Sequence, residues 1–202
     1  MQAEQKKSVQ DIIELFDIAE DKVKEIEQLN HEISIPSINE LRYVGYHLAR
    51  LFCEDDSQEI ELQIAKAKSH CQRAIYDAHE IGIIYMLEQI KLFKEQYMTF
   101  SHLVIEVLPN YIEILKKANQ AARFIAGIKE NHRNNRHSYY QECEPHYSVL
   151  RDSLDELMVA ELLIQQKIIE YRIKDRKQSR NFIITVVLSL MAIVVAALKL
   201  LA

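Results

Sequence analysis

Glycine and proline are scarce in this chain, and their scarcity limits the folds open to it. Only three of each occur in 202 residues, against average usage of about 7% glycine and 5% proline. Strands are joined by tight turns, which rely on the positive φ of glycine or the fixed φ of proline. A chain with so few turn residues is expected to form a small number of long helices. We therefore predict an all-α fold, organised as a long-helix bundle.

Capping signals and hydrophobic periodicity place the first three helices. The first is expected over about 8–30. Pro36 should break the chain, after which Ser37 and Glu40 form a capping box that opens a second helix ending near 53. Asp56 then caps a third helix. This helix meets no breaker before Pro109 except one glycine, so it is predicted to run for about 50 residues.

Two more helices complete the predicted bundle. The fourth is expected to start near Asn110, and the fifth near Pro145, since proline suits the first turn of a helix. The fifth helix has no stop signal before the C-terminal segment FIITVVLSLMAIVVAALKLLA. The last cytosolic helix is therefore predicted to continue into that segment without a break.

This C-terminal segment, 182–202, is long and apolar. At 1.5 Å per residue it would extend about 31 Å, close to the thickness of a bilayer core. Its single charge, Lys199, lies near the end, where a lysine can snorkel to the interface. We therefore predict a cytosolic helical bundle over 1–181 and one C-terminal transmembrane helix over 182–202.

Five cations precede the apolar segment and predict its orientation: Arg172, Lys174, Arg176, Lys177 and Arg180. The positive-inside rule places these juxtamembrane basic residues, and the body before them, in the cytosol. The N-terminus has no apolar run that would resemble a signal peptide. The expected localisation is a single-pass membrane protein, in the bacterial inner membrane, with membrane lipid as a partner.

Small and polar residues of the apolar segment recur at steps of four and three, along one side of a helix: Thr185, Ser189, Ala192, Ala196 and Lys199. Transmembrane helices associate through such small residues and through hydroxyl hydrogen bonds. This membrane seam predicts self-association, so a homo-oligomer is expected. In an assembly of several copies, these residues would be pore-lining.

The most specific local motif is LRYVGYHLARLF, in which Arg42 and His47 have four residues between them. A short helical protein with R-x4-H resembles the HEPN superfamily, and the layout of a helical body plus one membrane helix is similar to small membrane proteins of bacterial antiphage and CRISPR-associated systems. The resemblance implies that Arg42 and His47 are catalytic in cleavage of RNA across a dimer. Five residues turn a helix by about 140° net, however, so the two side chains should flank the apolar stripe rather than share one face.

Other chemistry has little support in the sequence. The histidines lack the spacing of a helical metal clamp, and no Gly-rich phosphate loop occurs, so neither a metal nor a cofactor is expected. The three cysteines form no CxxC pair and are expected to be buried free thiols. A net charge of -5 disfavours nucleic acid as a partner, while a protein of a defence system is a candidate partner.

These features favour a tail-anchored, oligomeric membrane effector in a bacterial defence or stress response, which forms a pore or perturbs the membrane. Two alternatives stay open. One is a membrane-tethered HEPN-type ribonuclease, and the other is a non-catalytic membrane scaffold or adaptor. The sequence therefore leans away from an enzyme.

Overall fold

The computed structural model describes the backbone of residues 3–131 and 136–201 and the side chains of residues 5–127 and 142–193. Within these ranges every regular element is helical: α1 (Ala3–Asn30), α2 (Ile35–Arg50), α3 (Ser57–Gln96), the short 3₁₀ turn η1 (Met98–Phe100), α4 (Ser101–Val107), α5 (Tyr111–Asn131) and α6 (Arg136–Leu201). The prediction of an all-α bundle is confirmed.

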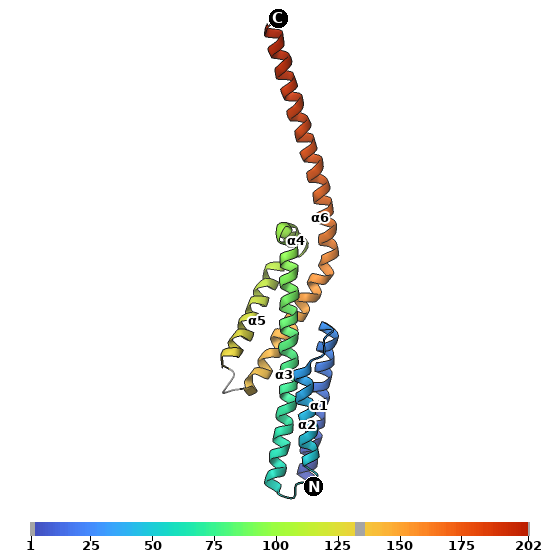
Figure 1. Ribbon diagram of the computed structural model, residues 1–202, viewed down its shortest axis with the longest axis vertical. Helices are drawn as coiled ribbons and strands as arrows, with labels where there is room; N and C mark the ends of the chain where they lie inside the picture. The colour runs from blue at the N-terminus through green and yellow to red at the C-terminus, as the bar shows by residue number, and fades with distance from the viewer. Residues whose placement is uncertain (1–2, 132–135, 202) are drawn as a thin grey trace.

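Helix α3 runs beside α1 and α2 along one part of its length and beside α5 and α6 along another (Figure 1), and it contributes to two hydrophobic cores. Its first half packs against α1 and α2 around the buried Ile12, Val44 and Cys71. Its second half packs against α5 and α6 around Met86, Leu150 and other buried aliphatic side chains. One long helix thus carries both halves of the molecule, as expected for a chain with few turn residues.

The start of α2 differs from the prediction. The helix begins at Ile35, so Pro36 lies in its first turn instead of before it. Proline is accepted there because the first turn has no intrahelical acceptor for its missing N–H. Ser37 is buried inside the helix, where its hydroxyl is 2.7 Å from that of Ser34, and no capping box with Glu40 forms.

Two other helix boundaries also differ. The chain bends after α3 ends at Gln96, well before Pro109, and continues as η1 and α4. Pro145 lies inside α6 rather than in its first turn. An interior proline costs a helix about 3 kcal/mol, and here its neighbours Cys143 and Tyr147 are buried in the core that offsets this cost.

Helix α6 extends far beyond the rest of the chain, as its red C-terminal part shows in Figure 1. It is continuous from Arg136 to Leu201, as expected for the last helix. From Ile169 to Ile193 every described side chain of α6 is exposed. The helix therefore has a buried first part, packed on α3, α4 and α5, and a projecting arm.

The predicted membrane span requires correction. Among the residues whose side chains are described, no helix is both long enough and apolar enough to cross a membrane. The described side chains of α6 end at Ile193. Between 182 and 193 the apolar run is only about 12 residues, or roughly 18 Å, against about 30 Å for a bilayer core. The predictions of a transmembrane helix and of a single-pass inner-membrane localisation are therefore wrong for the described chain.

Candidate functional site

Arg42 and His47 lie on different sides of α2. Arg42 is exposed and lines a groove of about 410 Å³ between α1 and α2, beside Phe16 and Glu27. His47 is buried against α3, with its Nδ1 atom 2.6 Å from Oε1 of Gln63. Helix geometry predicts this separation, and within one chain the structure does not bring the two side chains together.

His47 belongs to a cluster of stacked rings between α2 and α3. Its ring stacks on that of His70, with centroids 5.1 Å apart, and the Tyr43 ring also stacks on His70, at 5.2 Å. Nδ1 of His70 lies 2.5 Å from the Glu40 carboxylate. Two imidazoles are therefore held face to face by acceptors from both helices.

The acceptors in this cluster fix which imidazole nitrogen carries a proton. Gln63 donates its amide to Glu59, which leaves its Oε1 facing His47 as an acceptor. Nδ1 of His47 must then donate, and Nδ1 of His70 donates to Glu40 in the same way. These bonds hold α2 on α3. Within the described side chains, no group of three or more possible metal ligands comes together here or elsewhere.

A second polar cluster joins α1, α3 and α6. Tyr147 of α6 donates a hydrogen bond to Glu25 Oε1 at 2.6 Å, and Lys22 Nζ lies 2.7 Å from Glu25 Oε2 and 4.9 Å from the centre of the Tyr147 ring. His79 of α3 packs against Tyr147 at 5.2 Å. The cluster ties the base of α6 to both other helices.

His79 is the most buried ionisable group of this cluster. Its Nε2 atom lies 2.6 Å from Glu144 Oε2, but the angle between the two groups does not suit a hydrogen bond. Neither ring nitrogen of His79 has a hydrogen-bond partner among the described residues. Burial lowers the pKa of His79, even though Glu144 acts to raise it. Burial also raises the pKa of Tyr147. Hydrogen bonds from Lys22 and Tyr147 outweigh burial and lower the pKa of Glu25.

Two of the three cysteines are buried, and the third, Cys53, is exposed. Burial raises the pKa of the Cys71 thiol to about 11 and that of Cys143 to about 12. Both thiols therefore stay protonated near neutral pH and are poor nucleophiles. The expectation of buried free thiols is correct for these two and wrong for Cys53.

The predicted seam residues fall partly outside the described side chains. Ala196 and Lys199 lie outside them. Thr185 and Ser189 each donate a hydrogen bond of 2.9 Å to the carbonyl four residues earlier, at Asn181 and Thr185. These hydroxyl protons are satisfied within α6 itself. Ala192, like both of them, lies on the exposed arm.

All five predicted juxtamembrane cations are exposed on the same arm: Arg172, Lys174, Arg176, Lys177 and Arg180. Only the first of them reaches the bundle in the described contacts. The Arg172 guanidinium lies 5.1 Å from the centre of the Phe100 ring, a cation–π contact.

Helix α6 also carries a second apolar stripe, which sequence reasoning missed. Its first stripe, with Leu150, Leu157 and Ile164, is buried in the bundle. The second contains Val159, Leu162, Ile169 and Ile173, which are 76%, 70%, 57% and 51% exposed. Their spacing of three, seven and four residues places them on one side of a helix, with Gln166 between them. That spacing is the signal that could have revealed the stripe.

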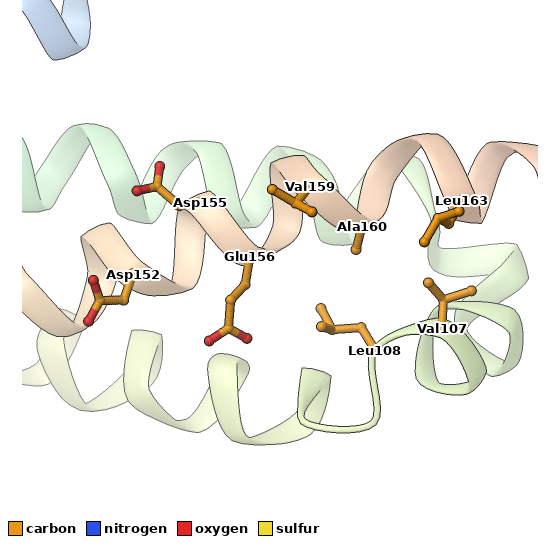
Figure 2. Close-up of a pocket in the computed structure, with 8 residues that line it drawn as sticks. All are labelled: Val107, Leu108, Asp152, Asp155, Glu156, Val159, Ala160 and Leu163. Atoms are coloured by element: carbon orange, nitrogen blue, oxygen red, sulfur yellow. The ribbon is translucent and has the colours of Figure 1, made fainter.

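A groove of about 570 Å³ lies beside this second stripe, between α6 and the turn from α4 to α5 (Figure 2). Leu108 faces Ala160 across it, and Glu156 reaches from α6 toward α5, where the Asn110 amide donates to its carboxylate at 2.5 Å. Asp152 also lines the groove. The stripe therefore borders an acidic rim at its N-terminal end.

Comparisons with known proteins add no family to this description. No protein-family model, no curated protein and no solved structure matches the chain. The resemblance to HEPN proteins therefore stays a hypothesis that rests on Arg42, His47 and the helical class.

Proposed function

We propose that this protein is a non-catalytic helical scaffold, in which the bundle holds α6 as an arm that binds a helical partner. The observation that carries the proposal is the second apolar stripe. A helix on a protein surface ordinarily has one apolar stripe that faces the core and a polar opposite face. Helix α6 has large apolar side chains on both sides, and more than half of the surface of each side chain in the second stripe is exposed.

The attachment of α6 also fits the role of an arm. Tyr97, the residue that follows α3, donates a hydrogen bond to Glu161 at 2.9 Å, and Lys167 pairs with Glu106 of α4 at 2.8 Å. These contacts fix the side of α6 that faces the bundle. The second stripe is thereby held outward on a rigid element, which lowers the entropic cost of binding a partner.

The ribonuclease hypothesis has less support. Arg42 and His47 face different helices, and His47 is already engaged with Gln63. Replacing Arg42 and His47 by alanine in the full chain, and assaying RNA cleavage, remains the direct test of a catalytic role.

Site-specific photo-crosslinking in the native host cell tests the scaffold proposal. A photoreactive amino acid replaces Leu162 of the second stripe in one variant. In the matched control it replaces Leu92, which is half-exposed on α3. An adduct with a helical protein, this chain included, is expected from position 162 and not from position 92. Absence of any adduct at 162, or equal adducts at both positions, would contradict the proposal.

A further inference from the structure

The charges on either side of the second stripe are distributed unevenly along α6. Acidic residues precede the apolar side chains: Asp152, Asp155 and Glu156 are all exposed. The five cations between Arg172 and Arg180 follow it, with a single acid, Asp175, among them. Arg151 pairs with Asp155 at 3.5 Å, and Glu170 is an exposed acid just before the cations. The net charge is still -2 over residues 151–156 and +3 over residues 170–180. The exposed face therefore changes from acidic through apolar to basic within about 28 residues, or roughly 42 Å of helix.

Such a face is complementary to itself only when two copies run in opposite directions. In a parallel pair, acids would face acids at one end and cations would face cations at the other, which is unfavourable at both. In an antiparallel pair, each acidic end meets the basic end of the partner while the apolar centres stay in contact. Two-fold symmetric pairs of this kind are common among homodimers.

We propose that the partner of the arm is a second copy of this chain, and that two α6 helices pair antiparallel along their second stripes about a two-fold axis between Leu162 and Gln166. This inference rests on the proposed scaffold function and names its partner. The axis places Val159 opposite the partner's Ile169, and Leu162 opposite the partner's Gln166. Asp152 then faces the partner's Arg176.

The α6 helix of the second copy would lie along the groove beside α6. The groove borders Val159 and Leu163 on the apolar part and Asp152 on the acidic part. Three carboxylates line the groove, those of Asp152, Asp155 and Glu156 (Figure 2). A helix that entered along the groove would bring its cations to these carboxylates.

Sedimentation equilibrium of the purified full chain tests the pairing. The wild type is expected to be a dimer, and Leu162→Glu is expected to raise its dissociation constant by about 30-fold or more, the effect of losing one central contact. Leu92→Glu, an equivalent change on α3, should leave the constant unchanged. A monomeric wild type would overturn the inference. Adsorption of that monomer to phospholipid vesicles would overturn it too, because the stripe would then have a different occupant.

Charge reversal tests the orientation. Arg176→Glu should weaken the dimer, and adding Asp152→Lys to it should restore wild-type affinity. Lys94→Glu changes the net charge equally on α3 and should have no effect. In a parallel dimer Arg176→Glu would exchange one repulsion for another, so an unchanged affinity would overturn the antiparallel arrangement.

Disulfide trapping gives a second measure of orientation. In a Cys53→Ser background, which removes the exposed native thiol, Val159→Cys and Ile169→Cys proteins of different mass are mixed and oxidised. A mixed disulfide is expected, and a Val159→Cys homodimer as the main product would overturn the inference. Cells that give an adduct from position 162 with another protein, together with a purified monomer, would overturn the second-copy inference and leave the scaffold function standing. No adduct at all would contradict both.

Discussion

Gly82 of α3 lies where side chains of α1 and α6 pack closely against the α3 backbone. A Cβ atom at this position would lie 2.6 Å from Ile26 Cδ1 and 2.8 Å from Tyr147 Cε2. The isoleucine end can turn aside, but the tyrosine ring is held by its hydrogen bond to Glu25. Overpacking at this site should cost about 1–3 kcal/mol, against a gain of about 1 kcal/mol in helix propensity. Gly82→Ala should therefore lower the free energy of unfolding.

Gly45→Ala is the matched control for this prediction. Gly45 is also within a helix, but nothing lies within 4 Å of the added Cβ. This variant should gain about 0.5–1 kcal/mol in the free energy of unfolding, since alanine is the better helix former. Urea denaturation of the two variants should give shifts of opposite sign. A shift in the same direction would show that Gly82 is not a close-packing site.

His79 should make stability depend on pH. Burial lowers its pKa in the folded state, so the folded chain binds fewer protons than the unfolded chain below the usual histidine pKa of about 6.5. The stability contributed by neutral His79 is complete above that pH. It is lost as the pH falls toward the folded pKa, by at most about 1.4 kcal/mol per pH unit for one proton.

Urea denaturation at pH 7.5 and 5.5 measures this dependence. His79→Gln, which cannot titrate, should lose less stability between the two pH values than the wild type does. His102→Gln removes an exposed histidine instead and should keep the wild-type loss. If the wild type and His79→Gln lost equal stability, the pH dependence would have to arise from groups other than His79.

At the scale of single elements, Asp56 shows where a capping signal succeeds. Its side chain accepts a hydrogen bond from the Gln58 N–H at 3.1 Å and begins α3 there, as predicted. Asp56→Ala should lower the free energy of unfolding by about 1 kcal/mol. Asp55→Ala, which removes an adjacent exposed acid, should change it by less than about 0.5 kcal/mol. Thermal unfolding followed by circular dichroism would compare them, and equal losses would argue against a cap.

Capping signals fail where tertiary contacts compete. Ser37 and Glu40 have the spacing of a capping box. In the structure, however, Ser37 is buried and Glu40 accepts a hydrogen bond from His70 across the interface with α3. Pro36 was expected to break the chain, although proline is also compatible with the first turn of a helix. The sequence permits both starts, and packing between α2 and α3 decides between them.

On the scale of the whole molecule, composition predicted the class of fold, and periodicity predicted most helices. The arrangement of polar side chains between helices was not accessible in the same way. The pairing of His47 with Gln63 joins residues from different helices, and its geometry depends on how α2 rotates against α3. The R-x4-H spacing drew attention to His47, but no local pattern indicates that its Nδ1 proton is already engaged.

Stability of the whole molecule should depend on protein concentration if two copies pair through α6. A dimer that unfolds to monomers gains stability by mass action as concentration rises. For a chain of this length, each tenfold increase should raise the melting temperature by roughly 2 °C. Differential scanning calorimetry over a hundredfold range should show this rise for the wild type and for Leu92→Glu. Leu162→Glu should show a smaller rise, because its weakened dimer is partly dissociated before the chains unfold. A concentration-independent wild type would mean that the second stripe of α6 does not join two copies of the chain.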